Sequence, residues 1–205
     1  MTEPLSMNQI IHAAVRRDVA RTEQALRALR DGDTARAREV QVAWRNLVRE
    51  LTHHHEAEDE HVWPFLQSRG VEMTLLEQME AEHVAMKTAL ASVSERLEAL
   101  VAATTAADAT AAADEVSRAE VVINGHLDHE ESDVEGPMAD LHDDAEFKAL
   151  SKKLRPASLV DAANALAWMQ DGAGARERAS LRATSRRTAA WMIWFMLIGE
   201  AILGP

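Results

Sequence analysis

Four stretches of this chain carry apolar side chains at steps of three and four residues, the spacing that lines up one side of an α-helix. Ser6 and Gln9 have the spacing of an N-terminal capping box, and Gly32 marks the end of the first stretch. The expected helices run from 7 to 31, from 33 or 34 to between 64 and 70, from 74 to about 102, and from about 108 to 134. Helices with one apolar stripe each and short connections predict an all-α fold, an antiparallel up-down-up-down four-helix bundle.

Composition agrees with this fold and limits the chemistry. Ala, Leu, Glu and Arg dominate, and no strand-like run of β-branched residues occurs. The net charge of −12 makes nucleic acid an unexpected partner. Without cysteine or tyrosine, any metal chemistry must use His, Asp and Glu. The N-terminal residues lack the basic and apolar regions of a signal peptide, so we expect a cytoplasmic protein.

Polar residues interrupt each apolar stripe where a core residue is expected. They are His12 in the first helix, His54 and Glu58 in the second, His83 in the third, and His126 and Glu130 in the fourth. Counted from the connections at about 1.5 Å per residue, they fall within about one helical turn of the same depth. The stripes therefore predict a cluster of ionisable side chains inside the bundle.

A cluster of this kind needs compensation. A lone inward histidine is usually a hydrogen-bonded core residue, and three adjacent histidines usually form a solvated surface. Buried unpaired carboxylates, however, cost several kcal/mol each. Ion pairing within the cluster compensates in part, whereas a metal centre compensates fully. The ligands are too many for one tetrahedral zinc and suit two octahedral ions with bridging carboxylates, which favours iron, then manganese. Affinity alone does not exclude zinc or copper.

The motifs around these residues resemble those of the hemerythrin-like family, also called HHE cation-binding domains. The matching stretches are IHAAVRRD (11–18), HHHEAEDEHVWPFL (53–66), EHVAM (82–86) and HLDHEE (126–131). The resemblance implies a four-helix bundle that holds two non-heme irons. It also implies that His12 and His54 bind one iron, His83 and His126 bind the other, and Glu58 and Glu130 bridge them.

The chain departs from the classical pattern on the third expected helix. Classical hemerythrins carry a second histidine four residues away there, but Met79 and Lys87 flank His83 at that spacing. Many HHE domains instead place a ligand directly after the second-helix histidine, which makes His55 the candidate seventh ligand. The remaining candidates are a solvated or outer His53, His61 at the bundle end, His129 and His142 on the surface, and Glu131 as an alternative to Glu130.

Three functional hypotheses follow from such a centre. The first is a protein that binds O₂ or a related small ligand, NO or peroxide. The second is a di-iron enzyme, with catalase-like, NO-reducing or O₂-dependent oxidase activity on an unknown substrate. The third is a module in which metal occupancy controls folding and a partner contact.

The last quarter of the chain has a different character, so we expect a bundle domain over 1–150 and a helical extension over 151–205. Residues 158–170 predict an amphipathic helix with Leu159, Val160, Ala163, Leu166 and Ala167 on one face. Arginines then precede the apolar run 189–198, which is too short to span a bilayer. The segment 188–203 fits a helix docked on the bundle or on another subunit of a homo-oligomer, or a membrane-surface anchor. Its anchors would be Trp168, Trp191, Trp194 and Phe195.

Overall fold

A computed structural model of the protein describes residues 4–141, 143–154 and 158–188, without the side chains of 184–188. Over these residues the regular structure is entirely helical, as predicted. The elements are α1 (Met7–Arg27), α2 (Thr34–Ala57), η1 (Glu58–Val62), α3 (Trp63–Ser68), α4 (Met73–Ala102), α5 (Ala106–Asp133), α6 (Glu135–Asp140), α7 (Ala145–Lys153), α8 (Leu159–Gln170) and α9 (Ala175–Thr188).

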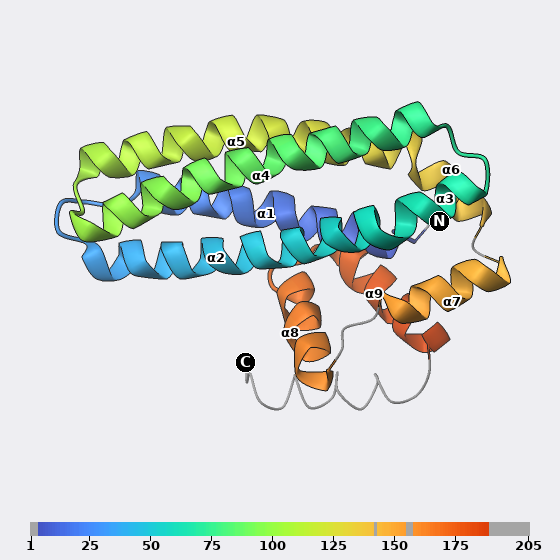
Figure 1. Ribbon diagram of the computed structural model, residues 1–205. Helices are drawn as coiled ribbons and strands as arrows, with labels where there is room; N and C mark the ends of the chain where they lie inside the picture. The colour runs from blue at the N-terminus through green and yellow to red at the C-terminus, as the bar shows by residue number, and fades with distance from the viewer. Residues whose placement is uncertain (1–3, 142, 155–157, 189–205) are drawn as a thin grey trace. The chain divides into compact units, whose positions relative to one another are not determined.

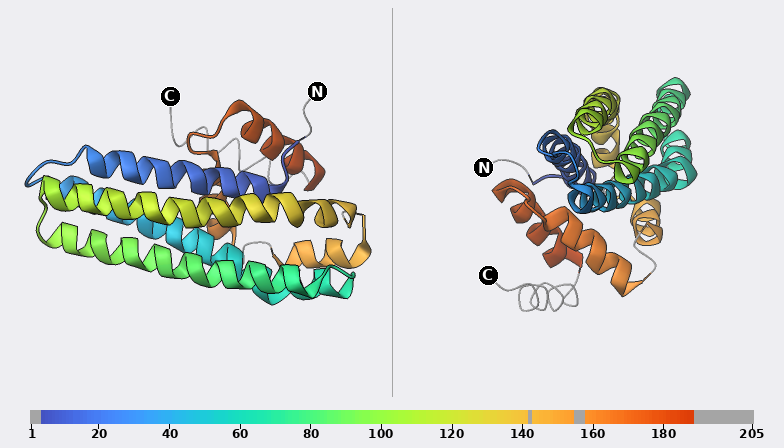
Figure 2. Two further views of the ribbon diagram at one scale, coloured as in Figure 1. Left: turned by 90° about the horizontal axis from the view of Figure 1, so that it is seen from above. Right: turned by 90° about the vertical axis from the view of Figure 1, so that its left-hand side faces the viewer.

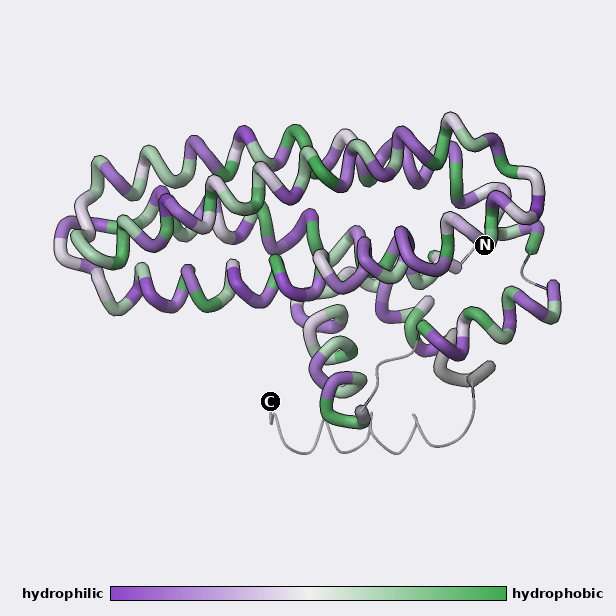
Figure 3. The backbone as a smooth tube through the Cα atoms, viewed as in Figure 1, coloured by the Kyte–Doolittle hydropathy of each residue, from purple (hydrophilic) through white to green (hydrophobic). Residues whose placement is uncertain are grey.

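The helices α1, α2, α4 and α5 run antiparallel to their chain neighbours and form the predicted bundle (Figures 1 and 2). Hydrophobic and hydrophilic residues alternate along each of them (Figure 3). The inward residues are fully buried, for example Val15 on α1, Leu51 on α2, Met86 on α4 and Ile123 on α5. Burial stabilises the fold by about 1.5–3 kcal/mol for each large apolar side chain, so the stripes hold the bundle together.

Local sequence sets most helix ends. The capping box is present, since the Ser6 amide donates to Gln9 Oε1 at 3.2 Å and the Gln9 amide donates to Ser6 Oγ at 3.0 Å. Gly32 has a φ of 82°, a left-handed conformation that favours glycine. The first helix ends at Arg27 rather than at residue 31, because Ala28 and Leu29 already form tighter turns.

The second helix contains a feature that the apolar stripe did not predict. Between α2 and α3 the chain forms a π-helix, η1, in which the Trp63 amide donates to the Glu58 carbonyl. A π-turn takes one more residue than an α-turn, so it changes the direction in which the side chains around it point. Such turns occur frequently at functional sites, and η1 begins at one of the candidate ligands.

The chain contacts define two compact units, residues 15–154 and residues 1–14 with 155–205. The boundary lies inside α1, which continues through it without a break. In the second unit, the Leu5 amide donates to Ser180 Oγ at 2.9 Å. The predicted helix over 158–170 is α8, but Leu159 and Val160 on its expected apolar face are exposed, at 55% and 68%.

The apolar run 189–198 lies outside the described residues, so both interpretations of the segment 188–203 stay predictions. The division at residue 150 also stays a prediction. Among the helices that the structure describes, we find none with the length and apolar character needed to cross a membrane.

Candidate metal centre

Three buried histidines from three helices meet in the bundle interior. His55 of α2, His83 of α4 and His126 of α5 each place one ring nitrogen within 4.8 Å of the others. The Nε2 atoms of His83 and His126 are 3.2 Å apart. The rings of His55 and His83 are stacked, with centroids 4.0 Å apart. We call this group the three-histidine pocket.

A second group contains His12 of α1, His54 of α2 and Glu130 of α5, whose donor atoms also lie within 4.8 Å of one another. His12 lies one turn before Val15 on the continuous helix α1, so it extends the buried face of that helix. Glu130 is fully buried, whereas 13% of the His54 side chain is exposed. The two groups together contain five of the six polar residues that the stripes placed in the core, all except Glu58.

Two buried carboxylates lie between the groups. Glu58 Oε1 is 3.2 Å from His54 Nε2, and Glu58 Oε2 is 3.6 Å from His83 Nε2. Glu130 belongs to the second group, and its Oε2 lies 3.7 Å from His126 Nε2 in the first. Each carboxylate therefore faces histidines of both groups, which is the geometry that a bridging ligand needs.

Burial changes the ionisation of these side chains. Burial, and then the neighbouring Glu130 carboxylate, raise the pKa of Glu58 well above its usual value. Burial, and then the nearby His83 ring, lower the pKa of His126. Both shifts favour the uncharged form of the side chain, a protonated carboxyl group on Glu58 and an imidazole with a free lone pair on His126. A bound cation would take the place of that proton and bind the imidazole lone pair, so the donor set fits a metal.

Two outer carboxylates, Asp59 and Glu82, contact the far nitrogens of the three-histidine pocket. Asp59 Oδ1 lies 2.7 Å from His83 Nδ1, and Glu82 Oε2 lies 3.0 Å from His126 Nδ1. About a third of each outer carboxylate is exposed, 32% and 33%. The sequence analysis missed both, because acidic residues at the edge of a stripe resemble ordinary surface charges.

The end of the bundle beside the pocket is apolar. Trp63 is buried and lies 6.0 Å from His83 between ring centroids. It belongs to a core cluster with Val62, Leu66, Leu76, Met79 and Val134. These buried side chains place apolar surface on one side of the histidines, and Met86 is also fully buried.

The remaining candidates take outer positions. His53 is exposed and His61 is about one-third exposed. His129 was expected at the surface, but it is 28% exposed and its Nδ1 lies 2.8 Å from Glu82 Oε1. Glu131 accepts a hydrogen bond from Arg16 at 2.7 Å, because its side chain points toward α1. His142 lies outside the described residues.

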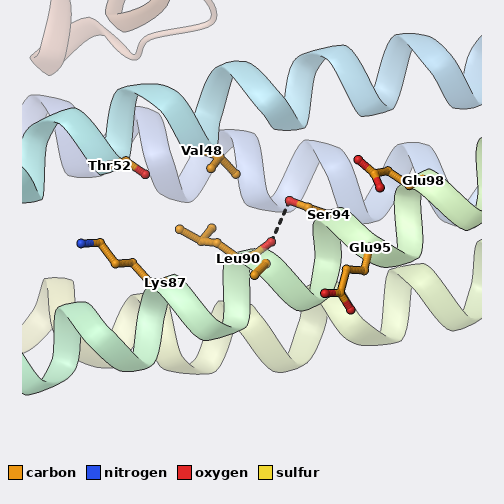
Figure 4. A pocket seen from close by; sticks show the side chains of 8 residues that line it. Val48, Thr52, Lys87, Leu90, Ser94, Glu95 and Glu98 are labelled. Carbon is orange, nitrogen blue, oxygen red and sulfur yellow. Dashed lines mark hydrogen bonds between the residues drawn. The ribbon is translucent and has the colours of Figure 1, made fainter.

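A shallow cavity of about 360 Å³ lies on the surface between α2 and α4. Figure 4 shows Val48 and Thr52 on one wall and Lys87, Leu90 and Ser94 on the other. None of the side chains that line it belongs to either histidine group. This surface cavity is therefore separate from the candidate metal centre.

An all-helical bundle with clustered buried imidazoles and carboxylates defines a cation-binding helical protein. Comparison with protein families agrees: the family model described as "Hemerythrin HHE cation binding domain" matches residues 10–136. The chain therefore belongs to the hemerythrin family, and the resemblance of its motifs is confirmed. No match was found among curated proteins or among solved structures.

Proposed function

We propose that this protein holds two iron ions in its bundle and uses them to bind O₂ or a related small ligand, NO or peroxide. The observation that carries the proposal is that Glu58 and Glu130 each face histidines of both groups. Two separate mononuclear sites would not need shared carboxylates. The proposed ligands are His12, His54, His55, Glu58, His83, His126 and Glu130.

The side chains have distinct roles in this proposal. His55, His83 and His126 would hold one ion, and His12 and His54 would hold the other. Glu58 and Glu130, which face both groups, would supply shared carboxylate ligands and balance the charge. When bound, a pair of iron(II) ions with an open coordination position supplies reversible binding of a diatomic molecule. Trp63 and Met79 keep water away from the histidines.

The identity of the metal follows from the number and type of donors. Five imidazoles and two carboxylates exceed the four ligands of a structural zinc site. Nitrogen and oxygen donors with bridging carboxylates favour iron, then manganese. Zinc and copper remain competitors by affinity, so the metal content of the purified protein decides this part of the proposal.

An enzyme that turns over peroxide or NO is the second candidate, and α4 favours it. At the spacing where a classical hemerythrin has another histidine, α4 carries the buried Met79 on one side and the exposed Lys87 on the other. Neither residue type is a common iron ligand, so the ion near His83 has room for an exogenous molecule.

The test is metal analysis of the full chain, with absorption spectra recorded anaerobically and after O₂, NO or peroxide. We expect about two irons per chain and a reversible spectral change with O₂ or NO. Catalytic loss of peroxide or NO would favour the enzyme instead. A large metal-linked gain in stability with an inert spectrum would favour a structural, iron-responsive module. One zinc per chain with no visible bands would contradict the di-iron proposal.

A matched pair of variants tests the site itself. His55 is buried in the three-histidine pocket, whereas its neighbour His53 is exposed. His55→Ala should lower metal occupancy, and His53→Ala should leave it unchanged. Equal losses in both variants would show that the second helix does not contribute ligands in the proposed way.

A further inference from the structure

The three-histidine pocket contains a contact whose character depends on which ring nitrogens carry protons. The Nε2 atoms of His83 and His126 face each other at 3.2 Å, and both rings are fully buried. On their far sides, each Nδ1 lies within hydrogen-bond distance of an outer carboxylate, Asp59 or Glu82. Each ring therefore has a carboxylate acceptor at Nδ1 and the other ring at Nε2.

This arrangement selects one tautomer for each ring. An ionised carboxylate can only accept a hydrogen bond, so it requires a proton on the nitrogen that faces it. The proton of a neutral His83 then resides on Nδ1, and the same holds for His126. Both Nε2 atoms are left with lone pairs that point into the pocket. Two lone pairs that face each other at 3.2 Å repel, and a cation bound by both nitrogens relieves that repulsion.

The outer carboxylates are themselves held in place. Trp63 Nε1 donates to Asp59 Oδ1 at 3.1 Å, the same oxygen that faces His83. Glu82 uses its other oxygen, Oε1, to contact His129 Nδ1 at 2.8 Å. A partly exposed carboxylate loses side-chain freedom when it has two partners, so the position of each histidine is fixed from outside the pocket.

The two outer carboxylates come from different elements. Asp59 lies inside η1, and its side chain contacts both Trp63, which follows η1, and His83 on α4. Glu82 lies on α4 next to His83 and reaches across to α5.

We propose that Asp59 and Glu82 are positioning residues that hold His83 and His126 as paired Nε2 donors before any ion arrives. The inference rests on the proposed function for the identity of the ligands, but not for the state of the rings in the metal-free protein. Removing such partners of a metal-binding histidine typically lowers metal affinity by on the order of 10–100-fold.

The first experiment reads the tautomers directly. Proton–nitrogen correlation spectra of the imidazole rings in the metal-free, full-length protein distinguish a protonated Nδ1 from a protonated Nε2. We expect protonated Nδ1 for His83 and His126 in the wild type. In Asp59→Asn, we expect a mixture of protonated Nδ1 and protonated Nε2 for His83 and no change for His126. In Glu82→Gln, we expect the mixture for His126 and no change for His83. A mere loss of packing would not change one ring and spare the other.

The second experiment measures affinity by anaerobic titration with Co²⁺, whose visible bands report nitrogen ligation. Asp59→Asn and Glu82→Gln should each weaken binding by on the order of 10–100-fold. Glu60→Gln and Glu80→Gln are the controls, because each removes one exposed charge from the same segment without touching a histidine of the pocket. If the control variants lost as much Co²⁺ affinity, the loss would be explained by the change in net charge alone, and the proposal would be overturned.

Trp63→Phe separates positioning from charge. It keeps an aromatic ring in the core but removes the donor to Asp59. We expect mixed tautomers for His83 and a smaller loss of Co²⁺ affinity than in Asp59→Asn. Unchanged ring tautomers in Asp59→Asn and Glu82→Gln would overturn the inference. A wild type with protonated Nδ1 on both rings but no iron would instead contradict the proposed function and leave this inference standing.

Discussion

At the scale of single residues, the buried carboxylates of the bundle interior lower the stability of the fold unless their charge is neutralised. Glu58 and Glu130 are buried carboxylates beside each other, and the pKa of Glu58 is raised mainly by burial. A protein of this size has only about 5–15 kcal/mol of net stability, so such groups are expensive unless they are neutralised. The candidate centre is therefore stabilised by what it binds.

We expect Glu58→Gln to stabilise the metal-free protein at neutral pH by about 1–2 kcal/mol, because the amide does not need to take up a proton or bury a charge on folding. Since the folded-state pKa of Glu58 is raised, its contribution to stability is present below its ordinary value and is lost as the pH rises. The advantage of the variant should therefore grow from pH 4 upward. Denaturant unfolding of metal-free protein across this range measures it.

The same variant should bind metal less tightly, since it lacks one shared carboxylate. Stability and affinity would then change in opposite directions. Glu56→Gln is the control, because Glu56 is exposed on the same helix. A variant that lost stability at neutral pH while keeping its affinity would contradict this account of Glu58.

The inward position of the polar residues could be predicted from sequence. His12, His83 and His126 continue stripes of buried apolar residues, and all three are buried in the structure. The stripe did not predict His55, because two adjacent residues cannot both continue one regular stripe; the resemblance to HHE domains supplied it. The outer carboxylates could not be found from spacing, since their partners lie on other helices or depend on η1.

At the scale of elements, η1 is the departure from regular structure that matters most. The bundle and its stripes were predictable, because a period of 3.6 residues leaves a clear signal over long helices. A π-turn leaves no such signal, because it lasts one turn and its residues are ordinary helix formers. The end of α1 differed from expectation because helix ends depend on local hydrogen bonds.

We expect deletion of Glu60, an exposed residue inside η1, to convert the π-turn into regular α-helix. Residues after the deletion would keep their core positions, so the free energy of unfolding should change by no more than about 1 kcal/mol. Glu58 and Asp59 would point elsewhere, and metal affinity should fall. Glu60→Ala keeps the residue count and is the control. Equal affinity in the deletion and the substitution would contradict a role for η1.

A second element-scale contact joins α1 to α5 beside the centre. Arg16 donates to Asp128 at 2.6 Å and to Glu131 at 2.7 Å, and Glu131 is adjacent to Glu130. Partly exposed ion pairs contribute little, so Arg16→Met should lower the free energy of unfolding by about 1 kcal/mol or less. Thermal unfolding at low and high salt measures it, and the difference between the proteins should shrink as salt rises.

At the scale of the whole molecule, metal binding and folding are one equilibrium. The proposed ligands come from α1, α2, α4 and α5 and from η1, so an unfolded chain cannot assemble them. Any ion that binds only the folded chain must raise its stability in proportion to its concentration and affinity. The positions of the polar residues in the apolar stripes already indicated this dependence, because burying several histidines and carboxylates at one depth needs compensation.

We expect iron(II) at about 100 times its dissociation constant to stabilise the full chain by about 2.7 kcal/mol per site. For a protein of this length, one site corresponds to a rise in Tm of roughly 5–10 °C. Anaerobic calorimetry with and without a chelator measures it. A Tm that changes with neither iron nor the chelator would contradict the coupling. A sodium salt at the same ionic strength is the control for salt effects.

The four carboxylates around the histidines also set a charge balance. Glu58 and Glu130 lie inside, and Asp59 and Glu82 face the far nitrogens of His83 and His126. Fully ionised, they carry about four negative charges, which two divalent cations cancel. A poorly solvated interior favours such electroneutrality, so the loaded centre suits divalent ions as it stands. Trivalent ions would leave a surplus of positive charge and create a demand for an anionic ligand.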